Sequence, residues 1–338
     1  MNTQMTLLKT IIERAKAQPK RIVLTEGEDE RILKAAVRLS ADNVAQVTVL
    51  GNVTAITDKV SSLGLALGEV AVIDPTESHL RESLATLLVE LRAKKGMTYE
   101  KAYELAGQPL WFANLLVKAG HQEGVVSGAV HTTGEVVRAA IQVIGVDKAF
   151  KMISSFFLMV LDKPHHPRQG GMVFSDCGLV IDPDAAQLAQ IASAAANSYQ
   201  ALTGDAAKVA MLSFSTNGSA SHVGVDKVSE ATALVKAARP ELAIDGEVQL
   251  DAAIVPAIAS KKIVNSEVNG EANVLVFPSL EAGNIAYKLV ERFAGATAIG
   301  PLLQGLAQPA NDLSRGCSAD DVYYVAAVTV VQAQVETC

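Results

Sequence analysis

The sequence has little of several things that would point to other classes of protein. Aromatic residues make up 4% and charged residues 19% of the 338 residues. Acidic residues outnumber lysine and arginine by 36 to 29, and the formal net charge of −7 argues against nucleic acid as the main partner. No uncharged apolar run is long enough to span a bilayer, so no membrane partner is expected either.

Cysteines and metal patterns are equally scarce. The three cysteines, Cys177, Cys317 and Cys338, form neither a CxxC pair nor a zinc spacing, which favours a reduced, cytoplasmic chain. The adjacent pair His165 and His166 has no third ligand nearby in the sequence. The acidic residues between 245 and 251 do not have the spacing of an EF-hand loop, so no metal is expected.

Familiar nucleotide and hydrolase motifs are missing as well. There is no Walker loop and no Gly-x-Gly-x-x-Gly after the first expected strand, which disfavours a nucleoside triphosphate or a standard Rossmann dinucleotide. There is also no Gly-x-Ser-x-Gly elbow of the kind that carries a nucleophilic serine. We therefore expect no permanently bound cofactor.

The chain does contain ample material for buried sheets. Hydrophobic residues make up 49%, and with few aromatics the cores should be Ala, Val, Leu and Ile, as in parallel sheets covered by helices. Strands expected at 21–24 and 47–50 flank a helix expected around 31–39, which predicts a βαβ unit. The fold class is α/β, with two three-layer domains of mainly parallel sheet. We expect residues 1–149 plus 302–338 in the first domain, 150–301 in the second, and an active site in the cleft between them.

The densest polar stretch runs from residue 311 to residue 321. It holds the hydroxyl of Ser314, the guanidinium of Arg315, a thiol and three carboxylates. Ser318 and Asp321 have the spacing of a capping box, which predicts a helix start. Asp321 would then point back over the loop that carries Ser314 and Arg315, although from the pattern alone helix capping is the plainer interpretation.

Two loops combine a strand end, small or hydroxyl residues and a helix start. Free backbone N–H groups at such helix starts favour anions, so Thr132, Thr133 and Ser215 are candidates for binding a phosphate. His131 could act as a base in the first loop, although a single loop histidine is more often structural.

Five blocks of the sequence resemble, in order, those of the phosphate acetyltransferase (phosphotransacetylase) family. They are residues 128–133, 173–177, 276–285, 299–306 and 311–321. The resemblance implies reversible transfer of an acetyl group between coenzyme A and phosphate, by direct attack of the coenzyme A thiolate on acetyl phosphate in a ternary complex. It also implies a homodimer, small-molecule substrates only (acetyl-CoA, CoA, phosphate and acetyl phosphate), and a two-domain layout similar to that of isocitrate and isopropylmalate dehydrogenases.

The same resemblance implies roles for individual residues. Asp321 would take the proton from the coenzyme A thiol, Ser314 would stabilise the tetrahedral oxyanion, and Arg315 would hold the departing phosphoryl group. Arg92 and Arg138 would bind coenzyme A phosphates. The candidates for binding phosphate or acyl phosphate are Arg315, Thr132, Thr133, Ser215 and Asn284.

Three alternatives stay open at this point. A phosphate butyryl- or propionyltransferase would share the chemistry and differ in the width of its acyl pocket. A metal-dependent oxidoreductase related to isocitrate dehydrogenase would have a similar layout. A non-catalytic acyl-CoA-binding module is a further possibility, against which the joint presence of Ser314, Arg315 and Asp321 argues.

Overall fold

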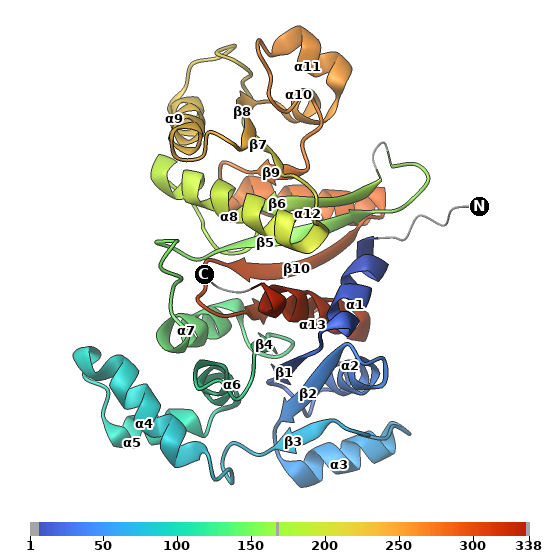
Figure 1. Cartoon of the computed structure of the whole chain (residues 1–338), viewed down its shortest axis with the longest axis vertical. Coiled ribbons are helices and arrows are strands. Elements are labelled where there is room, and N and C mark those ends of the chain that lie inside the picture. Colours follow the sequence, from blue (N-terminus) through green and yellow to red (C-terminus); the bar gives the residue numbers. More distant parts are fainter. Residues whose placement is uncertain (1–6, 167–168, 336–338) are drawn as a thin grey trace. The chain divides into compact units, whose positions relative to one another are not determined.

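The computed structural model describes residues 7–166 and 169–335. The chain divides into two compact units (Figure 1): an inserted unit, Ala149–Gly305, and a discontinuous unit formed by Leu8–Lys148 together with the chain from Leu306 onward. The predicted return to the first domain at residue 302 is a few residues too early. Strand β10 (Thr297–Gln304) pairs with β5 (Ser154–Leu161) through its last three residues, so these belong to the sheet of the inserted unit.

The discontinuous unit is built on a five-stranded sheet in which every pairing is parallel. Its strand order is β11-β4-β1-β2-β3. The strands are β1 (Lys20–Leu24), β2 (Ala45–Leu50), β3 (Ala71–Ile73), β4 (Gly124–Ser127) and β11 (Ala310–Asp312). The order reverses between β1 and β4, and in open α/β sheets such a switch point is where ligands bind, at the carboxyl ends of the strands.

Helices cover both faces of this sheet. Val125 of β4 belongs to a core cluster that it shares with residues of α4, α6 and α7, whereas the neighbouring Gly124 lies against Thr329 of α13. The cores consist mainly of Ala, Val, Leu and Ile, as predicted. The helices are α1 (Leu7–Ala17), α2 (Glu30–Ala41), α3 (Val53–Ser62), α4 (Arg81–Arg92), the 3-10 turn η1 (Ala93–Lys95), α5 (Tyr99–Ala106), α6 (Pro109–Lys118), α7 (Thr133–Val143) and α13 (Ala319–Gln334).

The inserted unit has a six-stranded mixed sheet of order β10-β5-β6-β9-β7-β8. The pairings β10–β5 and β5–β6 are antiparallel and the other three are parallel. The polar turn predicted between β5 and β6 joins these two strands as a hairpin, with residues 167–168 lying outside the described part. The remaining elements are β6 (Gly170–Ser175), α8 (Ala185–Thr203), β7 (Lys208–Leu212), α9 (Val223–Ala238), β8 (Ala243–Val248), α10 (Leu250–Ile254), α11 (Pro256–Lys262), β9 (Val274–Val276) and α12 (Leu280–Ala294).

The α/β class and the mainly parallel sheets are therefore confirmed, and so are the predicted helix starts. Ser318 and Asp321 form a reciprocal capping box at α13, and Thr132 and Glu135 form another at α7. Among residues 7–166 and 169–335, no helix is both long and apolar enough to cross a membrane.

Candidate active site

Three loops meet at the carboxyl ends of β1, β4 and β11 in the discontinuous unit. Asp312, the last residue of β11, lies opposite Ser127, the last residue of β4, so the loops that follow leave the same edge of the sheet. Gly128 has a φ of +109°, and a Cβ there would lie 2.7 Å from the backbone N of Leu313. Only glycine permits this close approach of the two loops.

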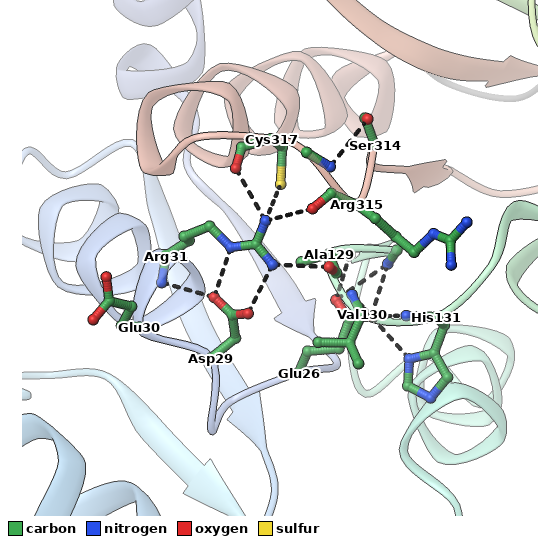
Figure 2. Close-up of polar contacts among 12 residues, drawn as sticks. Glu26, Asp29, Glu30, Arg31, Ala129, Val130, His131, Ser314, Arg315 and Cys317 are labelled. Carbon is green, nitrogen blue, oxygen red and sulfur yellow. Dashed lines mark hydrogen bonds and ion pairs between the residues drawn. The ribbon is translucent and has the colours of Figure 1, made fainter.

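A buried carboxylate organises the loop after β4. Glu26 follows β1, and its two oxygens accept the backbone N–H groups of four consecutive residues, Gly128 to His131, at 2.9–3.1 Å. Nδ1 of His131 lies 2.8 Å from Oε1 of the same carboxylate (Figure 2). The prediction of free N–H groups in this loop is therefore wrong, because Glu26 occupies the position that an anion would take.

The second predicted anion loop, in the inserted unit, is filled in the same way. Ser215 is fully buried and its hydroxyl donates to Oε1 of Glu247 at 2.8 Å. The N–H of Gly218 donates to the same oxygen, also at 2.8 Å, and Ser229 donates to the other oxygen. Burial alone would raise the pKa of Glu247, but these hydrogen bonds together lower it. We therefore leave Ser215 out of the proposed site.

Asn284 lies on α12 of the inserted unit and also has partners within the protein. Its amide Nδ2 donates to the carbonyl of Cys177 at 3.0 Å, and its Oδ1 accepts from Lys288 at 2.7 Å. These contacts fix the side chain against its own unit. Its assignment to acyl phosphate stays a prediction without structural support.

Arg31, at the start of α2, connects all three loops of the discontinuous unit (Figure 2). Its Nη1 donates to the backbone oxygens of Arg315 and Cys317 at 2.8 and 3.1 Å. Its Nη2 donates to the backbone oxygen of Ala129 at 2.8 Å and to Asp29 at 2.8 Å. The hydrogen bond with Asp29 raises the pKa of Arg31 and lowers that of the carboxyl. One guanidinium therefore holds the backbone of the Ser314–Arg315 loop against the loop after β4.

Ser314 and Arg315 themselves are exposed. The Ser314 hydroxyl accepts the N–H of Gly316 at 3.2 Å, which leaves its own proton available. The guanidinium of Arg315 makes no hydrogen bond or ion pair with any described residue, and Figure 2 shows it extending away from the contacts of Arg31. A fixed backbone with an uncommitted guanidinium suits the binding of an external anion.

The two adjacent carboxylates at the start of α13 differ in their surroundings. Asp320 is exposed and pairs with Nη1 of Arg38 at 2.6 Å. Asp321 is half-buried, and its Oδ2 accepts the N–H and the hydroxyl of Ser318 at 2.7 and 2.9 Å. Its charge contributes to the raised pKa of Cys317, so the Asp321 carboxylate is close to the loop. Asp321 therefore caps α13 and also lies close to the loop that carries Ser314 and Arg315.

Asp312 is a titratable group of the site that the sequence did not single out. Its side chain is fully buried, and burial raises its pKa to about 7, with the charge of Glu26 adding to the effect. The hydroxyl of Thr133 donates to its Oδ2 at 2.6 Å, while Oδ1 has no hydrogen-bond partner among the described residues. The hydroxyl of Thr133 is thus bound to Asp312, and that of Thr132 is bound to Glu135 in the capping box.

The predicted coenzyme A arginines lie on two helices of the same unit that contact each other, α4 and α7. Arg138 is on the exposed side of α7. Arg92 ends α4, is half-buried, and its Nε has no partner among the described residues. No described hydrogen bond joins either arginine to the loop of Ser314, so their role in binding stays a prediction.

Cys317 lies next to the contacts of Arg31. Its side chain is buried, and burial raises the pKa of the thiol to about 11 in spite of the opposing charge of Arg31. Such a thiol stays protonated at neutral pH and is a poor nucleophile. Cys177 is fully buried in the inserted unit, where burial raises its pKa further.

The histidines and acidic residues that the sequence analysis weighed and rejected as metal ligands are engaged in the fold. Nε2 of His165 and Nε2 of His166 each lie 2.8 Å from the backbone oxygen of Ala294. Asp245 accepts the N–H of Glu267 at 3.0 Å. Within the part of the chain that the structure describes, no three His, Cys, Asp or Glu residues are grouped as metal ligands would be.

Polar loops at the switch point of a parallel sheet define the class of α/β proteins that bind a small ligand at the carboxyl ends of their strands. A model of the phosphate acetyl/butaryl transferase family matches residues 6–330. The chain belongs to this family, which confirms the resemblance seen in the sequence.

Individual relatives agree with this assignment. The phosphate acetyltransferase of Clostridium acetobutylicum is 47% identical over 330 residues, covering 98% of this chain and 99% of the relative. A phosphotransacetylase from Streptococcus pyogenes has a TM-score of 0.91 at 40% identity, with 98% of each chain covered. The EutD phosphotransacetylase from Staphylococcus aureus has a TM-score of 0.89 at 43% identity and covers 97% of this chain and 98% of its own.

Proposed function

We propose that the protein catalyses the reversible reaction of acetyl-CoA and phosphate to give coenzyme A and acetyl phosphate. The observation that carries this proposal is the loop of Ser314 and Arg315. Arg31 fixes the backbone of this loop, while the guanidinium of Arg315 has no partner among the described residues. The curated relatives at 42–48% identity that cover nearly all of this chain are named phosphate acetyltransferases, which supports acetyl over butyryl transfer.

In the proposed mechanism the coenzyme A thiolate attacks the acetyl carbonyl of acetyl phosphate directly, in a ternary complex. Asp321 removes the thiol proton. The Ser314 hydroxyl donates to the oxyanion that forms at the carbonyl, and Arg315 binds the phosphoryl group as the carbon–oxygen bond breaks. Ordinary aspartate and thiol pKa values of about 3.9 and 8.5 make the proton transfer uphill by roughly 6 kcal/mol, so positive charge beside the thiol is needed to reduce the cost. Arg315 supplies such a charge in this loop.

The test is a thioester-absorbance assay with acetyl, propionyl and butyryl phosphate side by side. We expect acetyl phosphate to give the highest kcat/KM, with coenzyme A as acceptor. A preference for butyryl phosphate would favour the alternative acyl specificity. Binding of acyl-CoA without turnover of any of the three would favour a non-catalytic module.

Replacing Arg92 or Arg138 by Ala should raise the KM for coenzyme A by about 10- to 100-fold, because a charged hydrogen bond to a phosphate contributes about 1.5–3 kcal/mol. The KM for acetyl phosphate should change less. Dephospho-coenzyme A lacks the 3′-phosphate. If one of the two arginines contacts that phosphate, its Ala variant should show little further increase in KM when dephospho-coenzyme A replaces coenzyme A. Lys59→Ala, an exposed change on α3, is the matched control. Normal coenzyme A binding by both arginine variants would make these residues ordinary surface charges.

Cys317→Ala should keep kcat within a few-fold of the wild type, because a thiol with a pKa of about 11 does not serve as a nucleophile at neutral pH. Alkylation of Cys317 in the wild type should be slow at pH 7 and accelerate as the pH approaches 11. Peptide mass spectrometry reports the rate. An inactive, folded Cys317→Ala together with an acetyl-thioester trapped on wild-type Cys317 would contradict direct transfer.

A homodimer is also proposed, and one surface of the inserted unit supports it. Ile285, Leu289 and Phe293 lie along one side of α12 and are 59%, 50% and 87% exposed. Such an apolar stripe is typical of an interface, and a mass measurement in solution tests the assignment. The cytoplasmic location and the absence of a permanently bound cofactor remain predictions.

A further inference from the structure

The proposed reaction moves a proton as well as an acetyl group. The thiol of coenzyme A loses a proton, and the leaving phosphate must gain one to depart as HPO4²⁻ rather than as the trianion. Asp321 accounts for the first transfer. Arg315 does not account for the second, because a guanidinium is not deprotonated in proteins. A proton donor beside the phosphoryl group would supply this proton to the oxygen as the C–O bond breaks.

His131 has the geometry of such a donor. Its Nδ1 is 2.8 Å from Oε1 of Glu26, whose side chain is only 4% exposed. That carboxylate accepts four backbone N–H groups, so its oxygens act as acceptors and Nδ1 of His131 carries the proton in their hydrogen bond. Nε2 makes no hydrogen bond with any described residue, and the side chain is 32% exposed. Nε2 is thus the ring atom open to a ligand.

Other histidines of the described chain are held differently. Nε2 of His165 and of His166 lies 2.8 Å from a backbone oxygen, and Nδ1 of His222 accepts the N–H of Gly224 at the start of α9. In those residues a ring nitrogen serves the local fold. In His131 a buried carboxylate fixes the ring and leaves the far nitrogen free, which is the arrangement of a histidine oriented for proton transfer.

His131 also lies where the phosphate is expected. Its loop runs from β4 to the N-terminus of α7, and one guanidinium, that of Arg31, donates to the backbone oxygens of both Ala129 in this loop and Arg315. The two loops are thereby held together at one edge of the sheet. Arg315 and His131 therefore lie on two adjoining loops of the same site.

We propose that Nε2 of His131 exchanges a proton with the phosphate, as a catalytic residue, and that Glu26 is its positioning residue; this rests on the proposed acetyl transfer. In the direction of acetyl-CoA synthesis the S–H bond breaks and its proton passes to Asp321. The C–S bond forms, and the bond between the acetyl carbon and the phosphate oxygen breaks with its electron pair on oxygen. The Nε2–H bond of the doubly protonated His131 ring supplies the proton to that oxygen, which leaves a neutral ring with its proton on Nδ1. Afterwards Asp321 returns a proton to solvent and His131 takes one up. In the opposite direction His131 removes the proton from HPO4²⁻ as it attacks.

The test compares His131→Ala with His79→Ala, a change at an exposed histidine of the same unit. We expect His131→Ala to lose about 100-fold or more in kcat, with the KM for coenzyme A nearly unchanged. Added imidazole should restore part of that activity, and His79→Ala should behave as the wild type. A kcat within threefold of the wild type would overturn the proposal. The proposal would also be overturned if imidazole did not restore the lost kcat of His131→Ala and if its kcat–pH profile kept the wild-type form.

Two further measurements keep the outcome decisive. If His131→Ala does not fold, His131→Gln carries the same test, and a changed form of the kcat–pH profile relative to the wild type is the expected result. Glu26→Gln should also change the form of that profile in an otherwise folded enzyme, and an unchanged profile would exclude Glu26 as the positioning residue. If the wild-type protein showed no acetyl transfer at all, the proposed function itself would be refuted. Failure of the His131 proposal and failure of the proposed function are therefore distinguishable.

Discussion

Asp321→Asn is expected to lower kcat by about 100- to 10,000-fold, because the variant has lost the general base for the coenzyme A thiol. Asparagine keeps a side-chain oxygen that can accept the N–H and the hydroxyl of Ser318, so the capping box at α13 should survive. The KM for coenzyme A should stay within a few-fold. Steady-state kinetics with acetyl phosphate and coenzyme A, together with a thermal melt, measure both effects.

The neighbouring Asp320 gives this experiment a matched control. Asp320→Asn removes an exposed ion pair with Arg38, and exposed pairs contribute only about 0–1 kcal/mol. Its kcat should therefore remain close to that of the wild type. A near-normal kcat in Asp321→Asn, or a larger loss in Asp320→Asn, would contradict the assignment of the base.

Local chemistry made part of this structure predictable. The capping box at α13 needs only residues three positions apart, so it was predicted correctly from Ser318 and Asp321. Strand β11 was missed, because Asn311 and Asp312 look like loop residues. Both are buried, and Asn311 is satisfied by Thr329 and Gln332 on the distant stretch that forms α13.

The residues that organise the site could not be predicted either, because their partners also lie far away in the sequence. Glu26 accepts N–H groups 102 to 105 positions further along the chain, and Arg31 reaches the carbonyl of Arg315 across 284 positions. No local pattern distinguishes Glu26 from its exposed neighbour Glu28. Only the strand order, with β1 beside β4 and β4 beside β11, shows that the loop after β1 belongs to the site. Because the contact of Glu26 with the loop after β4 was not predicted, the N–H groups of that loop were wrongly expected to be free.

Asp312→Asn should remove a large pH dependence from the stability of the protein. The folded-state pKa of Asp312 is about 7, raised by burial above an ordinary value of 3.8. Between these values the folded protein keeps a proton that the unfolded chain has lost. Stability therefore falls as the pH rises through this window and levels off above pH 7. At about 1.4 kcal/mol per pKa unit, the loss amounts to at most about 4 kcal/mol.

The variant lacks this titration, and its amide oxygen can still accept the hydroxyl of Thr133 as Oδ2 of Asp312 does. Its free energy of unfolding relative to the wild type should therefore rise by about 3 kcal/mol between pH 5 and pH 8, as measured by urea denaturation at the two values. Asp58→Asn, at an exposed position of α3, should leave the wild-type pH dependence unchanged. Parallel pH dependences in Asp312→Asn and the wild type would show that the Asp312 carboxyl is ionised in the folded protein at both pH values. In that case the buried pair of Asp312 and Glu26 would hold two negative charges, and a cation or water would have to satisfy Oδ1 of Asp312.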